Sequence, residues 1–346
     1  MKKTLKRFLF ALLVLVLGGL VWNYQLVYYG LKQGTGQLAI VLKARPVDEI
    51  LSDSLYPDSL KVRIHLIQEI RQFAFDSLGI NYSDNYTTFY NQGDKPLLWV
   101  VTGAEPFKLV AKEWKFPFLG SFTYKGFFDY AMAVKEKDAL FNQGLDTAID
   151  EVEGWSTLGW FKDPILSNML KRPAGGLANL IIHELTHGTL YIKDNVQYNE
   201  NLASFVGDRG ALLFLIYKYG KDSDEYMDYV KRKELSAGYI QLVLNGADQL
   251  DSLYASVDAD MTYEKKQEAK EEKLKELISG FKEYLSYYKD RDPAFYNRLD
   301  SINNTYFLGY RTYRQDQDMF EMELNESFNG NFKEYLSYLK KTYPSL

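Results

Sequence analysis

The sequence predicts an α+β fold, with a small mixed sheet in the first half of the chain and a mainly helical second half, preceded by one transmembrane helix. Three observations lead to this prediction. An uncharged apolar run follows a basic N-terminus, at residues 8–29. Segments rich in aromatic and β-branched residues, which favour strands, gather before residue 165. After residue 173, apolar residues recur at the three- and four-residue spacing of amphipathic helices.

The N-terminal run has the length and the flanks of a membrane anchor. Lys2, Lys3, Lys6 and Arg7 precede it, and a helix over residues 8–29 would be about 33 Å long, enough to cross the apolar core of a bilayer. No small-residue cleavage pattern follows the run, so an uncleaved anchor is favoured over a cleaved signal peptide. Basic flanks stay in the cytoplasm, which places the chain after about residue 30 outside it.

The sequence predicts two domains. Residues 1–30 form a cytoplasmic tip with the anchor, and residues 31–346 form one globular domain. Four parts of the second domain are expected: an α+β lobe at 31–175, two apolar helices at 176–221, a helical hairpin at 222–292 and a C-terminal helical segment at 293–346.

The elements follow from local patterns. Before residue 165 we predict helices over 46–78 and 129–144, a strand over 97–102, a strand or hairpin over 120–128 and a strand over 154–161. Gly126 is expected to form a turn or bulge in the second of these strand segments. After residue 173 we predict helices over 177–190 and 200–219, and a charged hairpin over 222–290 that breaks at 257–260.

Composition excludes several classes of chemistry. The 346 residues include 41 basic and 46 acidic side chains, a net charge of −5, so we expect no nucleic-acid partner. There are no cysteines, which excludes disulfides, thiol nucleophiles, cysteine-ligated metals and a lipid-modified N-terminal cysteine. There are only three histidines, so metal chemistry must use these and carboxylates.

The segment His183-Glu184-Leu185-Thr186-His187 has the spacing of a zinc site. Residues four apart share one face of a helix, so both imidazoles can bind one ion. Glu184 lies beside that face and can reach a water molecule that the ion activates, as a general base. Two core histidines on an apolar helix would be the alternative, but burying a carboxylate between them without a partner would cost several kcal/mol.

A catalytic zinc ion needs a third protein ligand. No histidine follows His187, and His65 lies far upstream in a helical pattern, so we expect a carboxylate. Glu200, at the start of the next apolar helix, is the best candidate, and Asp194 is the alternative. Ser204 and Asp208 are weaker candidates for orienting a zinc-bound histidine.

The segment from His183 to His187, followed by Asn199-Glu200, resembles the zinc peptidases whose third ligand is a glutamate on a second helix, the gluzincins. More closely, the chain resembles a bacterial family of predicted, membrane-associated aminopeptidases. The similar segments cover nearly the whole chain: 36–38, 70–73, 114–117, 124–126, 156–161, 163–164, 183–187 and 302–304.

This resemblance implies a gluzincin-like fold, with one zinc ion per chain bound by His183, His187 and Glu200 and with Glu184 as the base. It also implies the bacterial inner membrane as the location, with the catalytic domain on the periplasmic side. The chain departs from the family at Lys115 and Ser121, where relatives often have a cysteine pair. It also lacks the family's lipidated cysteine, which leaves residues 8–29 as the membrane attachment.

Substrate-binding residues are expected on either side of the metal. Gluzincins present an edge strand before the zinc helix, to which the substrate backbone adds as a further strand. The segment in that place contains Ser156, Thr157, Leu158, Gly159 and Trp160, and a core strand is the alternative interpretation of it. A hydrogen-bond donor for the oxyanion is also needed, and four candidates remain unranked: Tyr313, Tyr310, Asn304 and Tyr124.

The sequence thus predicts a membrane-anchored zinc peptidase that acts on peptides or proteins. Aminopeptidase activity is implied by the family resemblance alone. An endopeptidase with the same mechanism is the near alternative. A non-catalytic, membrane-tethered interaction module with a structural zinc ion is the alternative from a different class.

Overall fold

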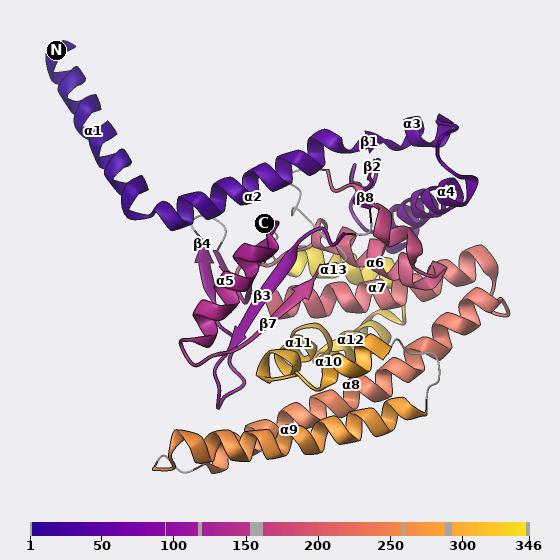
Figure 1. Ribbon diagram of the computed structural model, residues 1–346. Helices are drawn as coiled ribbons and strands as arrows, with labels where there is room; N and C mark the ends of the chain where they lie inside the picture. The colour runs from indigo at the N-terminus through magenta and orange to yellow at the C-terminus, as the bar shows by residue number, and fades with distance from the viewer. Residues whose placement is uncertain are drawn as a thin grey trace. The chain divides into compact units, whose positions relative to one another are not determined.

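The computed structural model describes residues 2–93, 95–116, 120–152, 162–257, 260–287 and 293–343 (Figure 1). The chain separates into two compact units, Met1–Ala44 and Arg45–Leu346. The sequence analysis placed this boundary at residue 30.

The first unit consists of two helices, α1 (Lys2–Trp22) and α2 (Tyr24–Lys43). The single helix expected over residues 8–29 is therefore interrupted at Asn23. Among the residues described, no one helix has both the length and the apolar character needed to cross a membrane. The segments Lys3–Gly19 and Tyr24–Lys43 meet that criterion only as a pair, with a bend of 84° between them.

The second unit is mostly helical. Its helices are α3 (Val47–Ser52), α4 (Asp58–Phe73), α5 (Tyr130–Phe141), α6 (Ala174–His187), α7 (Val196–Tyr219), α8 (Asp224–Ser256), α9 (Tyr263–Ser286), α10 (Pro293–Leu299), α11 (Asn304–Arg314), α12 (Gln317–Phe328) and α13 (Phe332–Thr342). A π-helical turn (Ala74–Leu78) follows α4, and a 3₁₀ turn (Ser167–Lys171) precedes α6.

The strands form three small sheets. The first joins β1 (Arg45–Pro46), β2 (Thr88–Tyr90) and β8 (Ile165–Leu166), the second joins β6 (Tyr124–Phe127), β3 (Trp99–Ala104) and β7 (Asp146–Glu151), and the third joins β4 (Trp114–Phe116) and β5 (Gly120–Phe122). In the second sheet β3 is central and antiparallel to both neighbours, with Val101 opposite Lys125 on one side and Ile149 on the other.

Two features of the strands differ from the prediction, and one predicted strand lies outside the described residues. Gly126 was expected at a turn or bulge, but it lies inside β6 opposite Val100, and the bend in this segment comes earlier, at Thr123. β7 was not predicted, because its sequence Asp-Thr-Ala-Ile-Asp-Glu is poor in strand-forming residues. It pairs with β3 along its whole length, so tertiary pairing outweighs local preference. The strand expected over 154–161 falls outside the described residues.

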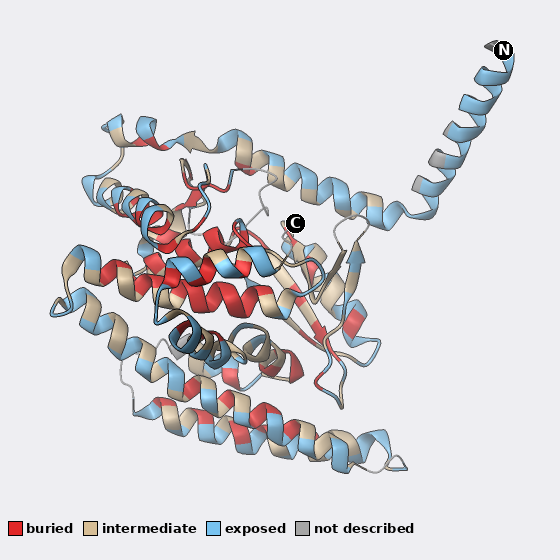
Figure 2. Cartoon of the chain, turned by 180° about the vertical axis from the view of Figure 1, so that it is seen from behind, coloured by how far each residue is buried: buried red, intermediate tan, exposed pale blue. Residues whose placement is uncertain are grey.

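Helices α6 and α7 form the centre of the second unit and are almost continuously buried (Figure 2). They approach closely at two glycines of α7. A Cβ atom at Gly207 would lie 2.9 Å from the carbonyl oxygen of Asn179, and one at Gly210 would lie 3.0 Å from the side chain of Ile182. Only a residue without a side chain permits this contact.

The long helices α8 and α9 pack side by side as the hairpin that the charge pattern predicts (Figure 1). Their facing apolar residues form one core with α11, which includes Val243, Leu250, Leu277, Phe281 and Phe307. The last two helices, α12 and α13, pack against α7 through aromatic rings, with Phe205 lying 5.7 Å from Phe320 between ring centroids. Helices thus surround α7 on several sides.

Candidate metal centre

Helix α6 presents two imidazoles on one face. The helix starts after Pro173, whose fixed backbone suits a helix start, and ends at Gly188. His183 and His187 lie one turn apart near its C-terminal end, and their Nε2 atoms are 3.2 Å from each other. The i, i+4 spacing therefore brings the two nitrogens together, as the sequence predicts.

Helix α7 supplies a carboxylate to the same point. The side chain of Asn195 caps this helix by accepting a bond from the Tyr198 N–H, so α7 begins at Val196 and Glu200 lies in its second turn. The Oε2 atom of Glu200 is 3.4 Å from Nε2 of His183 and 3.5 Å from Nε2 of His187. We call His183, His187 and Glu200 the His–His–Glu trio.

The dimensions of the trio fit a small tetrahedral cation. Ligand atoms about 2.0–2.1 Å from a zinc ion lie about 3.3–3.4 Å apart when the geometry is tetrahedral. The three distances within the trio, 3.2, 3.4 and 3.5 Å, match that spacing. Two nitrogens and one carboxylate oxygen are also ligands that zinc accepts. His183, His187 and Glu200 could therefore hold a metal ion together.

The charges within the trio favour an ionised Glu200. Burial alone would raise the pKa of this carboxyl, but the neighbouring imidazoles of His187 and His183 outweigh it and hold the pKa well below its usual value. Burial likewise opposes protonation of His187, but the charge of Glu200 outweighs it and raises the pKa of His187. The trio thus holds an anionic carboxylate next to two imidazoles.

Glu184 lies beside the trio without belonging to it. Its side chain is buried, and burial raises its pKa, although the nearby His183 and His187 partly offset this. A carboxylate with a raised pKa is a stronger proton acceptor than an exposed one. The position next to His183 and the burial together suit a base rather than a ligand.

Two of the four predicted oxyanion donors lie within electrostatic reach of the trio. The charge of Glu200, followed by burial, raises the pKa of Tyr313 well above its usual value. Burial, followed by the charge of Glu200, raises the pKa of Tyr124. Both phenols therefore keep their protons at neutral pH and can donate hydrogen bonds. Tyr313 as a whole residue is 40 % exposed, so part of it is open to solvent.

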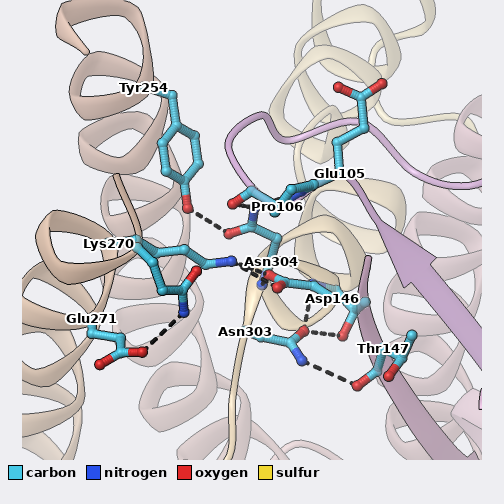
Figure 3. Close-up of polar contacts among 11 residues, drawn as sticks. Glu105, Pro106, Asp146, Thr147, Tyr254, Lys270, Glu271, Asn303 and Asn304 are labelled. Carbon is cyan, nitrogen blue, oxygen red and sulfur yellow. Dashed lines mark hydrogen bonds and ion pairs between the residues drawn. The ribbon is translucent and has the colours of Figure 1, made fainter. Parts of the chain in front are cut away.

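The other two predicted donors are held elsewhere. The side-chain amide of Asn304 donates to the carbonyl oxygen of Glu105 (2.8 Å) and accepts from the Tyr254 hydroxyl (2.8 Å), and its backbone N–H donates to Asp146 (2.9 Å; Figure 3). These bonds connect the start of α11 with β3, β7 and α8. Asn304 is therefore a residue of this polar network, and the structure does not bring it to the trio.

Tyr310 packs in an aromatic cluster with residues of α8 and α11. Its ring packs on Tyr306 and Tyr239, at centroid distances of 5.1 and 6.1 Å, next to the apolar core of the hairpin. Although Tyr310 is only one turn before Tyr313, it lies on the face of α11 that meets α8. A helix face decides which tyrosine reaches the site, and the sequence alone does not show which face is inward.

The predicted substrate strand, Ser156, Thr157, Leu158, Gly159 and Trp160, lies outside the described residues. The alternative third ligand, Asp194, is engaged elsewhere, since its Oδ1 accepts the backbone N–H of Ser121 at 3.1 Å. It is not part of the group that could hold a metal. His65 is exposed on α4 and is not part of that group either.

Asp208 binds residues other than the histidines. Its carboxylate accepts from the Asn179 amide (2.6 Å) and from the Tyr229 hydroxyl (3.3 Å), and it pairs with Arg314 (3.0 Å). Among the bonds of the described residues, none joins it to a zinc-site imidazole. Asp208 thus connects α7 with α6, α8 and α11.

Three residues near the site were not predicted. The ring of Tyr191 lies 6.0 Å from that of His187 between centroids, and burial followed by the charge of Glu200 raises the pKa of Tyr191. Tyr86 is fully buried with a left-handed φ of 63°, and burial followed by the charge of Glu184 raises its pKa. Asn201 is buried next to Glu200. The sequence could have indicated only one of these three residues, Asn201, because an asparagine on each side of Glu200 is unusual in a mainly apolar helix.

Comparison with known proteins gives one positive result. A sequence model of the family described as "Putative aminopeptidase" matches residues 28–343 of this chain. No curated protein matches the chain, and no solved structure does.

Proposed function

The chain belongs to the "Putative aminopeptidase" family, and on that premise we propose that it is a zinc-dependent peptidase whose ion is held by His183, His187 and Glu200. The observation that supports this most directly is the size of the His–His–Glu trio. Three ligand atoms from two helices converge at mutual distances of 3.2 to 3.5 Å, the spacing that a tetrahedral zinc ion requires.

Glu184 is the general base of this proposal. A zinc ion in the trio would supply Lewis acidity, polarising a peptide carbonyl and favouring ionisation of water. The Glu184 carboxylate accepts the proton of the attacking water and then gives it to the leaving amine. The burial that raises its pKa makes Glu184 better suited to both steps.

Tyr313 is the preferred donor to the oxyanion. The neighbouring Glu200 charge raises the pKa of its phenol, which keeps its proton, and the residue is partly exposed. Tyr124 is the second candidate, with a phenol that burial keeps neutral. A positioned donor of this kind contributes most when the negative charge develops on the carbonyl oxygen.

Aminopeptidase rather than endopeptidase activity is part of the proposal and rests on the family. The experiment that tests it digests a library of free and N-acetylated peptides with purified protein of known zinc content. We expect about one zinc ion per chain, cleavage of free peptides, loss of cleavage on chelation and recovery when zinc is added. Equal cleavage of acetylated peptides would indicate an endopeptidase. Full zinc content without any hydrolysis would indicate a non-catalytic module.

Membrane attachment through the N-terminal segment is also a proposal. It is supported by the uncharged run that begins at Phe8 and by the four basic residues before it. The orientation places residues after the segment outside the cytoplasm. Fractionation of cells that produce the full chain, followed by protease treatment of intact spheroplasts, tests both the attachment and the orientation.

A further inference from the structure

Asn201 on α7 holds the segment that contains Tyr313. Its Nδ2 donates to the carbonyl oxygens of Thr312 (2.7 Å) and Arg311 (3.3 Å), and its Oδ1 accepts the backbone N–H of Asp316 (3.0 Å). The side chain is 0 % exposed. One buried amide therefore binds the chain on both sides of Tyr313.

One bond of Asn201 satisfies a group that the end of a helix leaves open. The last four carbonyls of a helix lack partners within it, and that of Thr312 belongs to the last turn of α11. The Arg311 carbonyl, in the same turn, also accepts the backbone N–H of Gln315 at 3.4 Å. A second side chain of α7 acts on the same turn, because Asp208 pairs with Arg314 at 3.0 Å. Two residues of the metal-site helix thus fix the end of α11.

This attachment sets where Tyr313 lies relative to Glu200. Asn201 directly follows Glu200, so the helix turn that supplies the carboxylate of the trio also supplies the clamp on α11. A buried amide that makes three bonds to another element has little freedom, because breaking them would leave unpaired polar groups in the interior. The phenol of Tyr313 is therefore carried by a segment anchored at the trio.

We propose that Asn201 is a positioning residue for the reaction: through its bonds to Arg311, Thr312 and Asp316 it holds the Tyr313 hydroxyl where it donates a hydrogen bond to the oxyanion of the substrate. This inference rests on the proposed peptidase function. The competing role is a purely structural one, in which Asn201 stabilises the packing of α7 on α11 and nothing more.

Asn199 provides a matched control. It is a buried asparagine of the same helix on the other side of Glu200, and it also makes two bonds to another segment. Its Oδ1 accepts the N–H of Ile192 (2.8 Å) and its Nδ2 donates to the carbonyl of the same residue (2.7 Å). Replacing it removes a comparable set of bonds next to Glu200 without touching α11.

The first experiment needs no activity. Hydrogen–deuterium exchange of the full chain is compared for Asn201→Ala, Asn199→Ala and the unmodified protein. We expect Asn201→Ala to raise exchange at residues 311–317 and Asn199→Ala to raise it at 190–195. Unchanged exchange at residues 311–317 in Asn201→Ala would disprove that Asn201 holds the end of α11.

The second experiment is a double-mutant cycle with Tyr313→Phe on a peptide that the protein cleaves. We expect Tyr313→Phe and Asn201→Ala each to lower kcat, by about 100-fold for the first, with little change in KM. In the Tyr313→Phe background, Asn201→Ala should lower kcat by no more than about 3-fold further, because the hydroxyl it positions is gone. For the control pair, the fold-losses in kcat caused by Asn199→Ala and by Tyr313→Phe should multiply in the double variant. If the fold-losses in kcat of Asn201→Ala and Tyr313→Phe multiply fully as well, Asn201 has only a structural role.

The failure of this inference is distinguishable from that of the proposed function. If the unmodified protein cleaves no peptide, the peptidase proposal fails and the role of Tyr313 fails with it, whereas hydrogen exchange still decides whether Asn201 holds α11. Zinc content is measured for each variant. Loss of zinc in Asn201→Ala would show that the residue acts through Glu200, which would overturn the positioning role.

Discussion

Gly207 of α7 faces His183 of α6 so closely that a Cβ atom at position 207 would lie 3.1 Å from the Cβ of His183. The same atom would lie 2.9 Å from the carbonyl oxygen of Asn179, which is backbone and cannot turn aside. Helices α6 and α7 can therefore approach this closely at the candidate metal centre only because residue 207 is a glycine. This close approach also brings Glu200 within 3.4 Å of His183.

Gly207→Ala should separate the helices and weaken metal binding. We expect unfolding to become easier by about 1–3 kcal/mol, because the added methyl overpacks the contact. Zinc affinity should fall by about 10–100-fold, as for changes that misplace a ligand. Gly280→Ala is the control, since a Cβ there meets nothing within 4 Å. Zinc titration followed by thermal unfolding measures both effects, and unchanged affinity in Gly207→Ala would disprove the close-contact argument.

Glu184→Gln should separate metal binding from catalysis. The amide keeps the shape of the side chain but cannot accept a proton, so we expect about one zinc ion per chain and a loss of peptide cleavage of at least about 100-fold. Elemental analysis and peptide digestion provide the two measurements. Cleavage at the rate of the unmodified protein would show that another group is the base.

Glu200→Ala should lower zinc occupancy, because it removes one of the three ligand atoms of the trio. Asp194→Ala is the informative comparison. Its carboxylate is engaged by the N–H of Ser121, so this variant should keep full occupancy. Elemental analysis after dialysis against limiting zinc measures both variants. The reverse pattern would assign the third ligand to Asp194.

Lys270→Met should destabilise the protein strongly. The Lys270 side chain is 2 % exposed, and its Nζ lies 2.7 Å from both carboxylate oxygens of Asp146 (Figure 3). Removing the lysine leaves the largely buried Asp146 carboxylate without its cationic partner, although the Asn304 N–H still donates to it, and such a loss costs about 3–5 kcal/mol. Adding Asp146→Asn should recover part of that loss. Denaturant unfolding measures the free energy of unfolding of each variant. Lys265 is an exposed lysine of the same helix, so the control Lys265→Met should lie within about 0.5 kcal/mol of the unmodified protein.

Stability should fall at alkaline pH. Burial contributes most to raising the pKa values of three tyrosines above the usual value of 10.0: Tyr229, Tyr306 and Tyr335. The folded state binds these protons more tightly than the unfolded state, so the stabilisation is complete below pH 10 and is lost as the pH rises above it. Each such group contributes a slope of about 1.4 kcal/mol per pH unit. Spectrophotometric titration should show part of the tyrosinate signal appearing only with unfolding, and a smooth titration of every tyrosine in the folded protein would contradict this.

The sequence could predict the His–His–Glu trio because the trio depends mainly on local geometry. Spacing along one helix brings His183 and His187 together whatever surrounds them. Glu200 needed one further assumption, that the next apolar helix packs alongside, and the glycines of α7 make this possible. The long helices followed from the period of their apolar residues, which tertiary contacts reinforce.

The sequence named four donor candidates but could not rank them, and it did not indicate the residues that support the site, because both depend on which helix face is inward and on distant pairings. Tyr313 and Tyr310 are one turn apart on the same helix, and only the packing of α11 on α8 assigns the second to the core. The role of Asn201 depends on bonds to residues more than a hundred positions away. β7 forms because β3 offers a partner, despite a sequence that argues against a strand.

The ion pair between Lys270 and Asp146 also decides the alignment of α9 along its own axis. The apolar positions of this helix, such as Leu274 and Phe281, repeat with the helical period, so a slide by one turn would still bury an apolar face. Such a slide moves the Lys270 ammonium by about 5.4 Å, away from its only carboxylate contact in the described network and into an interior that cannot solvate it. The apolar stripe selects which side of α9 faces inward, and one charged residue selects its register.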